Sequence, residues 1–145
     1  MDKLVRKVTV EITTSFAKGA GTDGQAFLGL GGREFRLDID DHEDFERGDE
    51  TTYELGEGSN VVKPERNDPR VGLPITLEDV HAHPVYLRLV PDDKSDDWNI
   101  ANIHVKIQAG HEVARYSALD GPQENIWLGY ESGTWLHLKR APNEP

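Results

Sequence analysis

The sequence contains no cysteine, and it has few basic residues for its length. Without cysteine, neither a disulfide framework nor a thiolate metal site can form. Lys and Arg total 16 against 27 Asp and Glu, which gives a formal net charge of −11 at pH 7. We therefore expect no nucleic-acid binding, because that function needs Lys and Arg along the phosphates. Attraction to anionic lipid is also disfavoured unless a bound cation reverses the local charge.

Long apolar runs are missing as well. No segment approaches the ~20 apolar residues of a membrane-spanning helix, so we expect a soluble chain that is not transmembrane and is at most peripheral to a membrane. The segment Met1 to Arg6 has no apolar core of a signal peptide. A chain of 145 residues suits one buried core. We expect a single domain over residues 1–140 and a disordered tail over 141–145.

Alternation of apolar and polar residues dominates the chain, and helical periodicity is almost absent. The residues predicted to be buried on this basis are Val8, Val10, Ile12, Phe35, Leu37, Leu87, Leu89, Val105 and Ile107. The alternation changes phase between Ile100 and Ile103, which predicts a β-bulge near Ala101-Asn102. Short strands with regular turn signals predict an all-β, antiparallel β-sandwich.

Two segments interrupt the alternation. Thr76–His83 can form a short helix, because Thr76 and Asp79 have the spacing of a capping box. The preceding stretch, Ser59–Pro74, is rich in Pro, Asn and charge and is interpreted as a long surface loop. A zinc site at His81 and His83 would need a third clustered ligand, so we interpret these two residues as part of the surface.

The acidic residues concentrate in three of the predicted connections, 14–24, 38–49 and 91–97. If successive strands reverse direction, these connections share one end of the sandwich. Their carboxylates belong to Asp23, Asp38, Asp40, Asp41, Glu43, Asp44, Glu46, Asp49, Asp92, Asp93, Asp96 and Asp97. Such crowding favours a hard cation with 6–8 oxygen ligands, and calcium suits irregular loops better than magnesium. The alternative is that the acidic loops are simply solvated.

Three segments carry a family resemblance. They are Ala20-Gly-Thr-Asp-Gly-Gln-Ala-Phe-Leu-Gly-Leu, Phe45-Glu-Arg-Gly-Asp-Glu-Thr-Thr-Tyr-Glu-Leu and Asp96-Asp-Trp-Asn-Ile-Ala-Asn-Ile-His-Val-Lys-Ile. In this order they resemble the PLAT domain, the lipoxygenase homology domain that also occurs in polycystins and clostridial alpha-toxin. The match is good from Val8 to Ile107 and looser beyond. It implies an eight-stranded antiparallel β-sandwich of two four-stranded sheets.

The resemblance also implies a function. PLAT domains accompany catalytic domains and dock on membranes or partner proteins, often with calcium. The calcium ligands that it implies here are Gly21, Thr22, Asp23, Asp38, Asp44, Asp96 and Asp97. Lys18 and Gly19 depart from the calcium-binding pattern, so we expect weak affinity for calcium. The leading hypothesis is a calcium-assisted module for membrane lipid or a membrane-associated protein, and the alternative is a calcium-independent protein-interaction domain.

Two further expectations concern Phe16 and catalysis. Phe16 lies in the first acidic connection among polar residues, where it is either a membrane or partner contact or an anchor folded back onto the sandwich. Catalysis by general acid–base or nucleophilic chemistry needs a positioned His, Cys or Ser constellation, and the sequence shows none. We therefore expect a chain that is not an enzyme.

Overall fold

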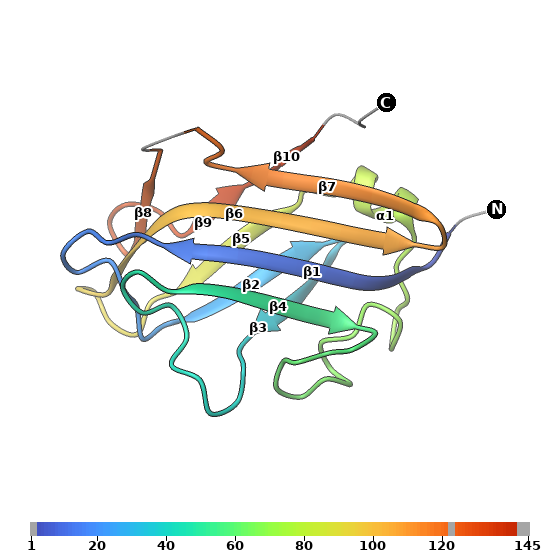
Figure 1. Cartoon of the computed structure of the whole chain (residues 1–145), viewed down its shortest axis with the longest axis horizontal. Coiled ribbons are helices and arrows are strands. Elements are labelled where there is room, and N and C mark those ends of the chain that lie inside the picture. Colours follow the sequence, from blue (N-terminus) through green and yellow to red (C-terminus); the bar gives the residue numbers. More distant parts are fainter. Residues whose placement is uncertain (1–2, 122–123, 142–145) are drawn as a thin grey trace.

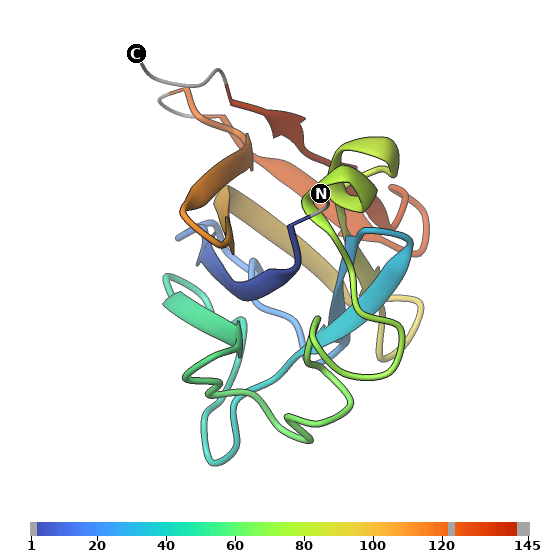
Figure 2. The same cartoon turned by 90° about the vertical axis from the view of Figure 1, so that its right-hand side faces the viewer.

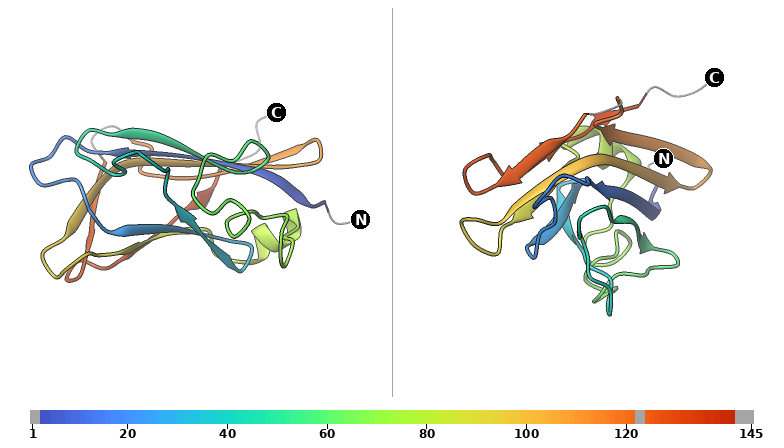
Figure 3. Two further views of the ribbon diagram at one scale, coloured as in Figure 1. Left: turned by 90° about the horizontal axis from the view of Figure 1, so that it is seen from below. Right: turned by 60° about the vertical axis from the view of Figure 1, so that its left-hand side comes forward.

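Two antiparallel sheets face each other in the computed structural model, which describes residues 3–121 and 124–141 (Figures 1 and 3). The strands are β1 (Val5–Thr14), β2 (Gln25–Leu30), β3 (Arg33–Leu37), β4 (Glu50–Gly56), β5 (Tyr86–Val90), β6 (Asp97–Ala109), β7 (Glu112–Ala118), β8 (Ile126–Gly129), β9 (Trp135–His137) and β10 (Lys139–Arg140). The larger sheet has the order β10-β7-β6-β1-β4, with β8 paired to β6. The smaller sheet has the order β3-β2-β5-β9. The predicted all-β antiparallel sandwich is confirmed.

The predicted division into two four-stranded sheets is wrong, because the sheets have six and four strands. The reason is the length of β6, which has 13 residues and pairs with two strands on the same side of the sheet. Its first part, Asp97 to Ile100, pairs with β8, and its second part, Ile103 to Ala109, pairs with β7. The two residues of β10 then extend the edge of β7.

The predicted bulge lies in β6. Thr13 is opposite Asn102 and Thr14 is opposite Ile100, so Ala101 is the extra residue that has no partner on β1. An extra residue turns every following side chain to the opposite face of the sheet. The apolar side chains of both halves of β6 therefore face the core. Trp98 and Ile100 before the bulge are therefore fully buried, as Ile103 is after it.

One hydrophobic core fills the space between the sheets. All the residues predicted to be buried belong to it, with exposed fractions of 3% or less. The β3–β4 loop adds Phe45, whose ring centroid lies 4.6 Å from that of Trp98 and 5.7 Å from that of Tyr53. Trp135, in contrast, is 49% exposed on the edge strand β9.

The helix α1 (Leu77–Ala82) begins where the capping box predicts it. The Thr76 hydroxyl accepts a hydrogen bond from the Asp79 nitrogen, and the Asp79 carboxylate accepts one from the Thr76 nitrogen. Figures 1 and 2 show α1 at the end of the sandwich opposite the β1–β2 connection. Within the described chain, no helix has the length and apolar character needed to cross a bilayer.

The connection over residues 59–74 covers two sheet edges. Asn60 accepts a hydrogen bond from the Glu54 nitrogen at 2.8 Å and donates one to the Thr52 carbonyl at 2.9 Å, on the free edge of β4. Asn67 accepts one from the Arg36 nitrogen at 2.7 Å on the edge of β3. Of the predicted tail, Ala141 donates to the Arg115 carbonyl at 2.8 Å, and residues 142–145 lie outside the described residues.

Candidate functional site

Three acidic connections meet at one end of the sandwich, as the alternation of strand direction predicts. They are the β1–β2 loop (15–24), the β3–β4 loop (38–49) and the β5–β6 loop (91–96) (Figure 1). Thr22 joins all of them, because its nitrogen donates to the Phe45 carbonyl at 3.0 Å and its hydroxyl donates to the Asp96 carboxylate. The hydroxyl lies 2.7 and 2.8 Å from the two Asp96 oxygens.

Gly21 explains how closely the first two loops approach. A Cβ atom on Gly21 would lie 3.1 Å from both the Phe45 carbonyl oxygen and the Arg47 nitrogen. Both of these are backbone atoms that cannot easily move aside, so a side chain at this position would push the loops apart. The predicted ligand role of Gly21 rests on its carbonyl, and the contact with the β3–β4 loop is a second reason for a glycine here.

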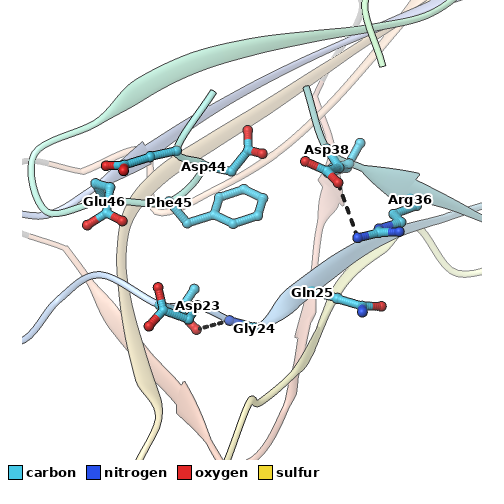
Figure 4. Close-up of a pocket in the computed structure, with 11 residues that line it drawn as sticks. Asp23, Gly24, Gln25, Arg36, Asp38, Asp44, Phe45 and Glu46 are labelled. Carbon is cyan, nitrogen blue, oxygen red and sulfur yellow. Dashed lines mark hydrogen bonds and ion pairs between the residues drawn. The ribbon is translucent and has the colours of Figure 1, made fainter. Parts of the chain in front are cut away.

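A cavity of about 330 Å³, which we call the acidic cavity, lies between the β1–β2 and β3–β4 loops (Figure 4). It is lined by Thr22, Asp23, Gly24, Gln25, Arg36, Leu37, Asp38, Glu43, Asp44, Phe45 and Glu46. Its single cation, Arg36, lies 3.1 Å from the Asp38 carboxylate. Within residues 3–121 and 124–141, no hydrogen bond or ion pair reaches the carboxylates of Asp23, Glu43 and Glu46. The cavity therefore carries an excess of negative charge.

Asp44 is the most strongly perturbed carboxyl group of the cavity. The Tyr53 hydroxyl donates to its Oδ1 at 2.8 Å, and the Ile39 nitrogen donates to its Oδ2 at 3.3 Å. Burial, reinforced by the neighbouring Asp38 carboxylate, nevertheless raises the pKa of Asp44 to about 6. Burial and the Asp44 carboxylate also raise the pKa of Tyr53, so its hydroxyl stays a donor. A bound cation would relieve this repulsion.

A second cavity of about 290 Å³ adjoins the first. Its lining residues are Gly19, Ala20, Gly21, Thr22, Asp23, Glu46, Arg47 and Asp96. Asp23 and Glu46 line both cavities and so connect them. Asp97 lines neither, because it lies on β6 opposite Gly129. The structure thus brings together six of the seven predicted ligand residues and leaves Asp97 outside.

The fit of these residues to calcium is mixed. Their donors are carboxylate, hydroxyl and carbonyl oxygens, which hard cations prefer. Yet in the part of the chain that the structure describes, no three acidic or histidine side chains are close enough together to hold a metal ion. The oxygens of Asp44 and Asp96 already accept hydrogen bonds from the protein. Calcium binding would therefore require a change in the loops.

Two exposed aromatic residues lie at the same end. Phe16, in the β1–β2 loop, is 76% exposed, and its ring lies over Gly48, where a Cβ would be 2.5 Å from it. Tyr130 follows β8 and is 62% exposed, with the Lys94 ammonium of the β5–β6 loop 5.5 Å from its ring centre. The sequence analysis did not single out Tyr130.

The sequence analysis missed Arg36 as a member of the site, and it counted Glu43 and Glu46 among the converging carboxylates without naming them as ligands. Glu43 and Glu46 belong to the acidic loop, but nothing in their spacing distinguishes them from its other carboxylates. The two histidines at positions 81 and 83 do not form a pair. His81 Nδ1 lies 2.8 Å from the Tyr116 hydroxyl, and His83 Nδ1 lies 2.8 Å from the Asp79 carbonyl.

No family model matches the sequence, and no curated protein matches it. Solved structures do match. The alpha-toxin of Clostridium absonum is similar over 96% of this chain, with 24% sequence identity and a TM-score of 0.58. The alpha-toxin of an avian strain of Clostridium perfringens is similar over 95%, with 23% identity and a TM-score of 0.60. Coral 8R-lipoxygenase is similar over 92%, with 19% identity and a TM-score of 0.56.

The chain has the fold of a PLAT domain. The predicted resemblance is thus confirmed at the level of the fold. The PLAT fold here spans 32% of each alpha-toxin and 17% of the coral enzyme. For coral 8R-lipoxygenase, calcium activation through a C2-like domain is described.

Proposed function

We propose that this chain is a non-catalytic docking module whose loop end binds membrane lipid with the assistance of calcium. The observation that carries the proposal is the acidic cavity, which lies at the same end as the exposed Phe16 and Tyr130 and contains three carboxylates, Asp23, Glu43 and Glu46, without a partner in the described chain. Aromatic side chains favour the interface between lipid and water. Carboxylates repel anionic lipid, so the two features are compatible on one surface only if a cation neutralises the cavity.

Calcium would be held by Asp23, Asp38 and Asp44 in the acidic cavity, with Gly21, Thr22 and Asp96 at the adjoining one. When bound, it would neutralise these carboxylates and supply a positive centre for a lipid phosphate. The calcium activation described for the coral enzyme supports this reading. Asp97 stays a prediction from the resemblance alone. The second candidate function is a calcium-independent protein-interaction domain, which the acidic surface also suits if the partner is basic.

Vesicle sedimentation tests the proposal. With phosphatidylcholine–phosphatidylserine vesicles, we expect the protein to sediment in calcium and to stay in solution with chelator. Phe16→Ala should reduce the sedimented fraction severalfold, because it removes an apolar contact of the loop end. Leu73→Ala is the matched control, since Leu73 is 78% exposed but lies in the 59–74 connection at the other end.

Each other outcome has a defined meaning. Equal sedimentation in calcium and in chelator would reject calcium assistance and keep the membrane function. Failure to sediment with any vesicle, in either condition, would reject the membrane function and leave the protein-interaction alternative.

A further inference from the structure

The outer face of the larger sheet carries a concave surface that shares no lining residue with the two cavities at the loop end. It is a groove of about 580 Å³ over β1, β6 and β7, which we call the basic groove. Its polar side chains include those of Thr9, Glu11, Lys106, Arg115, Ser117 and Asp120. Its volume lies within the roughly 300–1,000 Å³ that is usual for small-molecule sites.

The cations of this groove have no side-chain partners among the described residues. Register places Lys106 directly opposite Arg115, and Lys139 of β10 opposite Ser117 at the edge of the groove. Among the residues that the structure describes, no ion pair or hydrogen bond reaches the side chains of Lys106, Arg115 or Lys139. Like charges directly opposite each other on neighbouring strands destabilise a sheet. The chain has 27 Asp and Glu, yet none of them neutralises these three cations among the described residues. The cluster therefore suits an anionic ligand.

The same groove contains hydrogen-bond acceptors. The Glu11 carboxylate has no partner among the described residues. Asp120 accepts a hydrogen bond from the Ser117 hydroxyl at 2.7 Å and lies 3.6 Å from His104 Nε2, with acceptor capacity left over. A bare anion would be repelled by these two carboxylates. A ligand that also carries hydroxyl groups would donate hydrogen bonds to them.

We propose that the basic groove binds a phosphorylated polyol. The phosphate contacts Lys106 and Arg115, with Lys139 at the margin, and the ligand hydroxyls donate to Glu11 and Asp120. Guanidinium and ammonium groups bind phosphate through short, charge-assisted hydrogen bonds. Such a group occurs both in free sugar or inositol phosphates and in the headgroups of phosphorylated inositol lipids. The site is independent of the acidic loops and needs no calcium, so it goes beyond the docking function proposed above.

Calorimetric titration in the presence of chelator tests this site. We expect inositol 1-phosphate and glucose 6-phosphate to bind more tightly than inorganic phosphate, and unphosphorylated inositol not to bind. Lys106→Gln and Arg115→Gln should each weaken binding by about tenfold, since each removes a charge-assisted hydrogen bond. Both side chains face solvent and repel each other, so neither change should lower the melting temperature. Lys63→Gln removes another cation without a described partner, outside the groove, and should leave affinity unchanged.

Glu11→Gln distinguishes the contribution of the ligand hydroxyls from that of the phosphate. It should keep the phosphate contact but reduce the preference for the sugar phosphates over inorganic phosphate. Absence of binding by both phosphorylated polyols would overturn the proposal, as would unchanged affinity in the Lys106 and Arg115 variants. Inorganic phosphate that binds as tightly as the phosphorylated polyols would do the same.

A vesicle experiment in chelator identifies the source of the phosphate. Sedimentation with phosphatidylcholine vesicles that contain a phosphorylated inositol lipid, lost in Lys106→Gln, would assign a lipid headgroup. Binding of the soluble esters without sedimentation would assign a free phosphate ester. Both results support the groove. The loop variant Phe16→Ala should leave the titration with soluble esters unchanged, so this site and the calcium-assisted docking can fail separately.

Discussion

Asp44→Asn is expected to stabilise the protein in chelator at pH 7 and to remove most of its stabilisation by calcium. Folding buries the Asp44 carboxylate and holds it beside Asp38, which raises its pKa from 3.8 to about 6. Two pKa units correspond to about 3 kcal/mol in the free energy of unfolding. The Asn amide cannot accept from both the Tyr53 hydroxyl and the Ile39 nitrogen as the carboxylate does, so we expect a net gain of about 1–2 kcal/mol.

The stabilisation expected from Asp44→Asn depends on pH, because it reflects the protonation of Asp44. The folded protein holds the Asp44 proton more tightly than the unfolded chain, so this group favours folding most at low pH, below about 3.8. That contribution is lost as the pH rises through about 6. The stability difference between Asp44→Asn and the parent protein should therefore be largest at neutral pH and shrink toward pH 4.

In calcium the same variant should lose stabilisation, although it gains stability in chelator. Calcium at a hundred times its dissociation constant should stabilise the parent protein by about 2.7 kcal/mol for one site. On a scale of roughly 2–4 °C per kcal/mol, this is a rise of several degrees in melting temperature. Asp44→Asn should lose most of this rise because one anionic ligand is gone. Thermal melts with calcium and with chelator measure both effects.

Two controls belong to this experiment. Glu65→Gln changes a carboxylate in the 59–74 connection and should keep the full calcium response. Asp96→Asn tests the adjoining cavity by itself. A full calcium shift in Asp44→Asn would exclude Asp44 as a ligand, and a loss of stability in chelator at pH 7 would disprove the repulsion in the acidic cavity.

Trp98→Ala is expected to lower the free energy of unfolding by about 3–5 kcal/mol, the range for a large aromatic removed from a core. Trp98 is fully buried, and its indole nitrogen donates to the Thr14 hydroxyl at 2.9 Å. Its ring also packs on Phe45, which anchors the β3–β4 loop. The variant should therefore bind calcium more weakly as well as unfold more readily.

Urea denaturation measures the first effect, and Trp135→Ala is its matched control. Trp135→Ala removes the same side chain, but Trp135 is 49% exposed. This variant should therefore lower the free energy of unfolding by about 1 kcal/mol or less. Equal losses in the two variants would contradict the assignment of Trp98 as the anchor of the loop end.

The sequence was sufficient where a pattern extends over many residues. Alternation along β1 and β6 identified the buried residues and located the bulge at Ala101, because a phase change over a long strand is visible. The meeting of the acidic loops followed from counting strand reversals. The strand β10 was beyond this reasoning, since two residues carry almost no period.

The interior of the site was less predictable, because it depends on single loop residues. Phe45 has a φ of 63°, in the left-handed region that is uncommon for residues other than glycine. This turn directs Phe45 into the core and leaves the Asp44 carboxylate next to Tyr53 and Asp38. The alternation of apolar and polar residues does not predict such a turn. The pairing of Arg36 with Asp38 is likewise local, between residues on one side of the strand end.

The covering of the sheet edges by Asn60 and Asn67 has a consequence for ageing of the protein. Open edges pair with other chains and lead to aggregation, and natural proteins usually block them with charge, proline or a bulge. Here a single amide on each side occupies the backbone groups of β4 and β3. Deamidation turns an Asn side chain into a carboxylate, which cannot donate to the Thr52 carbonyl and instead repels it. Slow chemical damage at Asn60 would therefore uncover the edge of β4 and make the stored protein self-associate while its core is still intact.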